Sequence, residues 1–207
     1  MPVRIKFCGI TRAADAAAAV SLGVDAIGFV FYAPSPRYIE LEQAAAIARA
    51  LPPFVCKVGL FVNERAATVE QTCAAVGLNV VQYHGDETPQ ACARALRPWI
   101  KAIRVRPELD LAQECARYAA ASAWLFDSYD EQLYGGSGKR FEWDLLPHTH
   151  RRPIILAGGL TPDNVGEAIR ATAPYAVDVS GGIEAAKGIK DHDKMRKFIA
   201  EVKRLEC

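Results

Sequence analysis

Residues 154–182, IILAGGLTPDNVGEAIRATAPYAVDVSGG, contain one complete strand–helix–strand unit. Two short apolar runs, Ile154–Ala157 and Ala176–Ser180, are each followed by glycines, and an Ala-rich segment of helical period lies between them. Thr161 and Pro162 are residue types that start helices, because the hydroxyl caps free backbone N–H groups and proline fits the first helical position. The segment therefore predicts two parallel strands joined by a helix.

The same alternation of apolar runs and helical segments continues along the whole chain. The expected strands are Val3–Cys8, Ala26–Phe31, Val55–Phe61, Val80–His84, Ile100–Val105, Trp124–Asp127, Ile154–Ala157 and Ala176–Ser180. The expected helices begin near Ala13, Leu41, Glu64, Pro89, Leu111, Phe141, Pro162 and Asp191. This succession predicts an α/β protein: one (β/α)8 TIM barrel, compact and with short loops, in a single domain over residues 1–207. The alternative is a doubly wound open sheet, which usually has fewer strands.

The composition is that of an ordinary globular protein, and its charge balance limits the kinds of partner that the protein can attract. Among 207 residues, 25 Lys and Arg face 24 Asp and Glu, so the formal net charge is +1 and no overall field attracts nucleic acid or an anionic membrane. The longest uncharged stretch, residues 71–85, is too short to cross a membrane. Charges near the N-terminus interrupt any secretory signal, and six widely spaced cysteines favour reduced thiols over a metal site. We expect a cytoplasmic location.

Glycine clusters follow three consecutive expected strands. In a barrel, catalytic residues lie at the C-terminal ends of the strands, and a phosphate site often forms after strands 7 and 8. Any single cluster is most simply a tight turn, but three on one face favour backbone N–H groups that bind an anion. The predicted phosphate-binding residues are Gly135, Gly136, Gly158, Gly159, Ser180, Gly181 and Gly182. The expected partner is a phosphorylated small molecule.

Five further residues could carry chemistry. Cys8 ends the first expected strand, where a nearby cation or helix N-terminus would lower the pKa of its thiol and produce a base or nucleophile. Asp127 ends an apolar strand, so it is either a loop cap or a partly desolvated general acid. Asp178 lies inside the last strand and needs a partner or a substrate hydroxyl. Arg37 is either a carboxylate ligand or a solvated loop residue, and His84 is either a site residue or a core histidine.

These residues lie in motifs that resemble those of the phosphoribosylanthranilate isomerase family of tryptophan biosynthesis, over essentially the whole chain. The resemblance implies a (β/α)8 fold without a metal or an organic cofactor. The matching motifs, in order, are KFCGIT at 6–11, GFVF at 28–31, SPRY at 35–38, VQYHGDE at 81–87, GGSGK at 135–139, LAGGL at 156–160 and VDVS at 177–180.

The resemblance also implies a reaction, the Amadori rearrangement of N-(5'-phosphoribosyl)anthranilate to 1-(2-carboxyphenylamino)-1-deoxyribulose 5-phosphate. Asp127 matches the family's acid, which protonates the furanose ring oxygen and opens the ring to a Schiff base. Cys8 matches its base, which takes the proton from C2. Arg37 matches the residue expected to bind the anthranilate carboxylate, and Asp178 and His84 line the site.

The sequence departs from the family pattern in places, and three alternative functions are considered beside the isomerase. Ser180-Gly181-Gly182 stands where two serines and a glycine are expected, and Tyr83 replaces a usual leucine. Another sugar-phosphate isomerase or epimerase on this barrel would usually place metal-binding His and Asp at the strand ends, where this chain has only His84. A dual-substrate isomerase would be expected to carry Asp in place of Cys8. A non-catalytic phosphate-binding barrel is the third alternative. The sequence leaves monomer and homodimer equally open.

Overall fold

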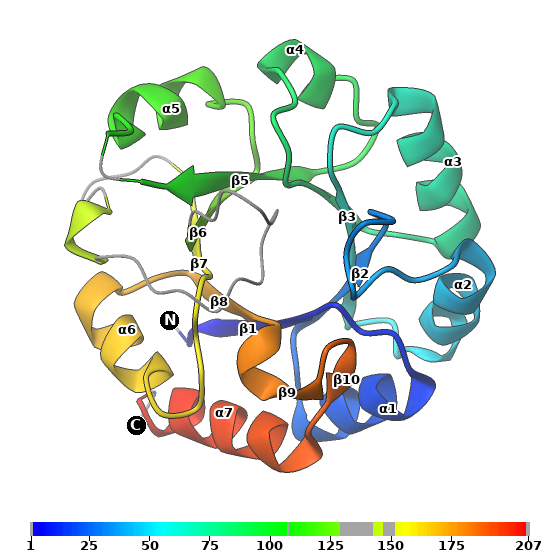
Figure 1. The fold of residues 1–207 in the computed structure, drawn as a ribbon, viewed down its shortest axis with the longest axis vertical. Helices are drawn as coiled ribbons and strands as arrows, with labels where there is room; N and C mark the ends of the chain where they lie inside the picture. Colours follow the sequence, from blue (N-terminus) through cyan, green and yellow to red (C-terminus); the bar gives the residue numbers. More distant parts are fainter. Residues whose placement is uncertain (1, 107, 129–142, 147–151, 206–207) are drawn as a thin grey trace.

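The computed structural model describes residues 2–106, 108–128, 143–146 and 152–205. Eight parallel strands form a closed barrel in chain order, in which β1 pairs with both β2 and β8 (Figure 1). The strands are β1 Arg4–Cys8, β2 Ala26–Val30, β3 Cys56–Phe61, β4 Val80–Tyr83, β5 Trp99–Val105, β6 Ala123–Ser128, β7 Ile154–Leu156 and β8 Ala176–Val179. The expected (β/α)8 barrel is confirmed, and closure by the β1–β8 pair excludes the open sheet.

Helices surround the barrel and alternate with its strands (Figure 1). They are α1 Ala13–Leu22, α2 Leu41–Ala50, α3 Ala66–Val76, α4 Pro89–Cys92, α5 Leu111–Arg117, α6 Val165–Thr172 and α7 His192–Arg204. The helix start expected near Phe141 lies outside the described residues, and the described residues that follow include a short 3₁₀ turn, η1 Trp143–Leu145. The predicted helix start at Pro162 is wrong, because Asn164 accepts the Thr161 N–H at 2.8 Å and closes a turn before α6 begins.

Strand alternation divides the apolar side chains into two layers. Along β6, Trp124 and Phe126 pack outward with the helices, whereas Ala123 and Leu125 point inward. The inner layer fills the barrel with small and branched side chains, namely Ile100, Ala102, Ala123, Leu125, Ile155, Ala157 and Ala176. The alternation places Asp127 on the inner face of β6, above this plug. The C-terminal end of the barrel can therefore hold polar chemistry over a closed apolar floor.

An additional hairpin lies between β8 and α7 and was not expected from the sequence. It consists of the 3₁₀ turn η2 Gly181–Ile183 and the antiparallel strands β9 Glu184–Ala186 and β10 Ile189–Lys190. Two of its charged side chains, Glu184 and Lys190, are buried. The hairpin thus adds charged groups to the end of β8.

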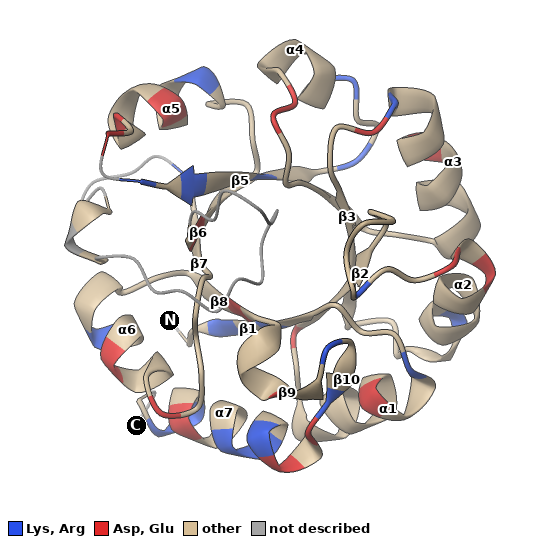
Figure 2. Cartoon of the chain, in the orientation of Figure 1, with Lys and Arg blue, Asp and Glu red and all other residues tan. Residues whose placement is uncertain are grey.

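Charge is arranged differently on the helices and on the barrel. Figure 2 shows both signs spread over the outer helices, with further charged segments on strands β1, β5 and β8. Charged residues inside a barrel need partners, because an unpaired buried charge is costly.

Within the described ranges, no helix has the length and apolar character needed to cross a lipid bilayer.

Candidate active site

A pocket opens at the C-terminal ends of the strands and brings the predicted site residues together. Its lining contains Cys8, Arg37, His84, Asp127 and Asp178. It also contains the predicted glycine loops, through Gly158, Gly159, Ser180, Gly181 and Gly182. Gly135 and Gly136 lie outside the described residues. The sequence therefore located the pocket, and the structure adds how each side chain is held in it.

Cys8 is buried beside a buried ion pair. Lys6, two residues earlier on the same inward face of β1, donates from Nζ to Asp178 Oδ1 at 2.9 Å. A Cβ built on Gly28 would lie 3.0 Å from Cys8 Sγ and 3.1 Å from Lys6 Nζ, so the two groups crowd the same glycine. Only glycine leaves them this room.

The electrostatic environment reverses one expectation. Burial raises the pKa of the Cys8 thiol, and although the Lys6 ammonium opposes this, the Asp178 carboxylate adds to the rise. The prediction that a nearby cation lowers this pKa below its usual value is therefore wrong, because desolvation outweighs Lys6. Burial also opposes the charge of Lys6 itself, but Asp178 more than compensates, so the pKa of Lys6 is raised. The buried ion pair therefore lies beside a thiol whose pKa is raised above its usual value.

Asp127 is buried at the end of β6 and contacts His84. Its Oδ1 accepts the backbone N–H of Ser128 at 2.8 Å, and its Oδ2 lies 3.2 Å from His84 Nε2. His84 in turn lies 2.9 Å from the amide nitrogen of Gln82, through Nδ1. His84 is thus a pocket residue rather than one buried in the apolar core.

Arg37 is buried rather than solvated, because its guanidinium binds Glu184 of the hairpin. Nε donates to Oε1 and Nη2 donates to Oε2, both at 2.8 Å. Lys190 adds a second cation 3.0 Å from Glu184 Oε1. Burial opposes the charge of Glu184, but Arg37 and Lys190 together hold the pKa of its carboxyl below the usual value. The planar fork of Arg37 is therefore fixed in the pocket wall, and Nη1 is not part of the ion pair.

The glycine loops after β7 and β8 touch each other. Gly158 and Gly159 have φ of 83° and 63°, the left-handed region that favours glycine. A Cβ on Gly182 would collide with the backbone oxygen of Leu160. Close packing between the loops therefore explains these glycines as well as anion binding does.

Ser180 is committed to the fold through its side chain. Its Oγ donates to the backbone oxygen of Cys8 at 3.0 Å, and its own backbone oxygen accepts from Lys190 Nζ at 3.1 Å. These bonds tie the end of β8 to the end of β1 and to the hairpin. A ligand at this end of the pocket would meet the backbone of Ser180 rather than a free hydroxyl.

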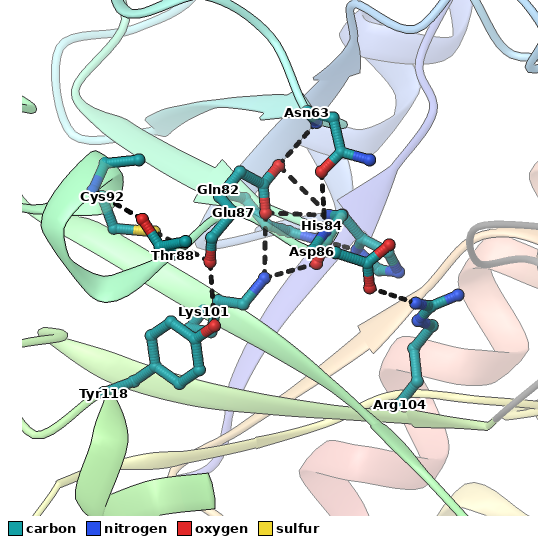
Figure 3. Close-up of polar contacts among 12 residues, drawn as sticks. Asn63, Gln82, His84, Asp86, Glu87, Thr88, Cys92, Lys101, Arg104 and Tyr118 are labelled. Atoms are coloured by element: carbon teal, nitrogen blue, oxygen red, sulfur yellow. Dashed lines mark hydrogen bonds and ion pairs between the residues drawn. The ribbon is translucent and has the colours of Figure 1, made fainter.

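A second buried ion pair supports the segment that follows His84 (Figure 3). Lys101 Nζ lies 2.9 Å from Glu87 Oε2 and donates to the Gly85 oxygen at 2.6 Å. Glu87 accepts backbone N–H groups from Asn63 at 2.8 Å and from Gly85 at 3.0 Å. Tyr118 donates its hydroxyl to the Glu87 backbone oxygen at 2.8 Å. This network fixes both polar backbone groups of the residue next to His84.

Comparison with known proteins gives a consistent result. Residues 5–201 match the family described as N-(5'phosphoribosyl)anthranilate (PRA) isomerase. The chain is 56% identical over 201 residues to N-(5'-phosphoribosyl)anthranilate isomerase of Pseudomonas fluorescens, covering 97% of this chain and 96% of that protein. The chain belongs to the PRA isomerase family.

Solved structures of PRA isomerases share the architecture. The structure of phosphoribosyl anthranilate isomerase from Thermotoga maritima superposes with a TM-score of 0.91 at 43% identity, covering 98% of this chain and 99% of that one. A PRA isomerase in complex with reduced 1-(o-carboxyphenylamino)-1-deoxyribulose 5-phosphate has a TM-score of 0.84 at 40% identity, with coverage of 98% and 99%. Similarity at this level over nearly full length confirms the family resemblance seen in the motifs.

Several polar residues of this PRA isomerase site were not predicted from the sequence. Lys6 and Gln82 lie two residues before Cys8 and His84, so strand alternation carries a signal for both. Glu184 and Lys190 lie in the hairpin, for which the sequence offered no periodic pattern. Among the described residues, no three His, Cys, Asp or Glu side chains are grouped so that they could hold a metal ion.

Proposed function

We propose that the protein catalyses, in this pocket, the isomerisation of N-(5'-phosphoribosyl)anthranilate to 1-(2-carboxyphenylamino)-1-deoxyribulose 5-phosphate, a step of tryptophan biosynthesis. In this proposal Asp127 is the general acid and Cys8 is the general base. The observation that carries the proposal is one buried carboxyl and one buried thiol, at the ends of β6 and β1, in the wall of a single pocket. Membership of the PRA isomerase family supports the reaction.

Ring opening needs a proton donor. Asp127 transfers its proton to the furanose ring oxygen, the bond between C1 and that oxygen breaks, and the nitrogen lone pair forms a protonated Schiff base at C1. Asp127 is left as a carboxylate, which the N–H of Ser128 already contacts through Oδ1. A fixed donor at that oxygen stabilises the negative charge as it develops.

Proton removal from C2 needs a base at Cys8. The thiolate takes this proton, and the electron pair left on C2 forms the C1–C2 double bond and neutralises the Schiff-base nitrogen. Burial raises the pKa of the thiol in the protein alone. The positive charge of the Schiff base is a nearby charge of the opposite sign, so it favours the thiolate when the base is needed. Ketonisation at C2 and protonation at C1 complete the isomerisation.

Two groups bind the ends of the substrate. The backbone of the glycine loops after β7 and β8 binds the phosphate, and Arg37 binds the anthranilate carboxylate. The bidentate bond to Glu184 holds the guanidinium plane in place before substrate arrives. We also propose that residues 1–207 act as one catalytic domain, located in the cytoplasm, as a monomer or a homodimer.

The test uses freshly prepared phosphoribosylanthranilate and follows its fluorescence. Cys8→Ser and Asp127→Asn keep the shapes but remove the base and the acid, and each should lower kcat by about 10² to 10⁴ with KM within a small factor. Cys56→Ser is the matched control, because Cys56 starts β3 and is absent from the pocket lining. Near-normal turnover in Cys8→Ser would show that the thiol serves only in packing.

A further inference from the structure

Gln82 and His84 form a polar couple on the inner wall of β4. Both side chains, which are labelled in Figure 3, are buried, Gln82 completely, and both line the pocket. Gln82 Nε2 lies 2.9 Å from His84 Nδ1, and His84 Nε2 lies 3.2 Å from Asp127 Oδ2. The three side chains thus form a continuous row that starts at Gln82 and ends at the proposed acid.

The Gln82 atom that faces the ring, here Nε2, decides which nitrogen of His84 carries the proton. A primary amide nitrogen can only donate, so Nδ1 of His84 must be the unprotonated nitrogen of a neutral imidazole. A neutral imidazole carries one proton, which must then lie on Nε2. An N–H group of His84 therefore lies next to the carboxyl oxygen of Asp127.

Two polar atoms of Gln82 and His84 have no aligned hydrogen-bond partner in the part of the chain that the structure describes. Gln82 Oε1 and His84 Nε2 are buried and have no aligned hydrogen bond among the residues that the structure describes. Buried polar groups without partners are costly and rare in native structures, so each one needs a physical explanation, of which a catalytic role is one. The Nε2–H group is near the Asp127 carboxyl but not yet well directed at it.

We propose that Gln82 is a positioning residue for the general acid: its amide holds His84 in the Nε2-protonated tautomer, which presents an N–H to Asp127. The inference rests on the proposed function, in which Asp127 donates a proton to the substrate. Gln82 acts through His84 and takes no part in proton transfer. The proton of Nε2 stays on His84 throughout, and only Asp127 loses a proton.

The benefit comes after the proton has left Asp127. A hydrogen bond to a carboxylate is charge-assisted and stronger than one to a neutral carboxyl, so the Nε2–H stabilises Asp127 most when its proton is gone. An interaction that strengthens towards the transition state raises kcat rather than tightening substrate binding. Other groups that face this carboxyl are the Ser128 N–H and the more distant guanidinium of Arg37.

The opposite orientation of the Gln82 amide makes a different prediction. With Oε1 against Nδ1, the ring proton would lie on Nδ1 and Nε2 would present a lone pair to Asp127. Two acceptors would then face each other once Asp127 is ionised, which disfavours proton donation. The two arrangements differ in the protonation of one ring, and that difference can be measured directly.

The first measurement is ¹⁵N NMR of the protein with labelled histidine. The chain has 4 histidines, so the His84 resonances can be assigned by their loss in His84→Gln. The expected spectrum at neutral pH has a protonated Nε2 and an unprotonated Nδ1 that accepts a hydrogen bond. A proton on Nδ1 in the unaltered protein would overturn the proposal.

The second measurement is the kinetics of Gln82→Glu, which keeps the shape but replaces the donor with an acceptor. The carboxylate draws a proton onto Nδ1, either leaving Nε2 bare or creating an imidazolium that keeps Asp127 ionised. Either result should lower kcat at neutral pH by about 10- to 100-fold, with KM within a small factor. Gln113→Glu, the same change on an exposed face of α5, should leave kcat unchanged.

A double-mutant cycle separates this inference from the proposed function. Gln82→Glu should lower kcat no further when Asp127 is already Asn, because the acid through which it acts is gone. If the two changes lower kcat independently, Gln82 does not act through Asp127 and the inference fails. If Asp127→Asn alone retains activity, the proposed function fails instead, whatever the tautomer of His84.

Discussion

Two lysine–carboxylate pairs are buried in this barrel to nearly the same extent, on opposite sides of their strands. Lys6 and Asp178 are 2.9 Å apart with 5% and 7% of their side chains exposed, and Lys101 and Glu87 are 2.9 Å apart with 4% and 4% exposed. Lys6 points into the barrel beside Cys8, whereas Lys101 points outward and lies over the ring of Tyr118.

The surroundings of the two pairs differ more than their burial. Backbone groups of Asn63 and Gly85 complete the hydrogen bonding of Lys101 and Glu87, so this pair holds chain segments together. Asp178 instead lines the pocket, and Lys6 acts on the charge of Cys8. Burial of an ion pair is therefore no guide to its role, and the side of the strand and the kind of neighbour decide it.

The largest effect is expected from Lys6→Met. The change leaves the Asp178 carboxylate buried without its cation, which should cost about 3–5 kcal/mol of stability. It also removes the charge that opposes the rise in the pKa of Cys8. The thiolate fraction should fall, and kcat should fall with it, because the base must be unprotonated to take the proton from C2. Urea unfolding and steady-state kinetics measure the two parts; unchanged kcat would remove Lys6 from the mechanism.

Lys101→Met makes the same chemical change in the other pair and should affect stability far more than kcat. Loss of the ammonium leaves Glu87 buried, at a cost of about 3–5 kcal/mol. The kcat of the folded protein should stay close to that of the unaltered chain, because Lys101 is absent from the pocket that holds Cys8 and Asp127.

Arg196→Met provides the exposed control for Lys101→Met. It breaks a pair whose side chains are 63% and 75% exposed and should cost less than about 1 kcal/mol. A large fall in kcat in Lys101→Met would contradict the division between the two pairs.

The sequence predicted the barrel because every strand carries a local signal, an apolar run that ends at a turn. It also predicted Cys8, Asp127 and Asp178, because a polar residue at the end of such a run has only the mouth of a barrel in which to lie. For Arg37 and His84 the sequence leaves two interpretations open. A loop position suits a solvated arginine as well as a ligand-binding one, and a strand end suits a core histidine as well as one in the site. Only tertiary contacts with Glu184 and Asp127 decide these two cases.

The missed features have separate physical reasons. Lys6 and Gln82 follow the inward period of their strands, but burial of such polar side chains depends on partners from distant parts of the chain, Asp178 for Lys6. The hairpin with Glu184 and Lys190 is too short to show a period. The direction of the Cys8 pKa depends on the balance between desolvation and Lys6, and no spacing in a sequence gives that balance.

The smallest effect, and the sharpest test of the Lys6–Asp178 environment, is the pH dependence of Cys8 alkylation. Only the thiolate reacts, so the rate rises tenfold per pH unit until the pKa is reached. The alkylation rate of an ordinary thiol levels off at about pH 8.5. Because burial raises the pKa of Cys8, its rate should be lower at neutral pH and should still rise beyond that point.

Iodoacetamide labelling of the Cys8 peptide, followed by mass spectrometry from neutral to alkaline pH, measures this profile. Asp178→Asn should move the break to lower pH, because the carboxylate that raises the pKa is gone, and Lys6→Met should move it to higher pH. Lys101→Met should leave the profile in place, because Lys101 is not among the groups that shift this thiol. A break at the position of an ordinary thiol, or the same profile in all three variants, would mean that burial and the ion pair do not control the Cys8 thiol.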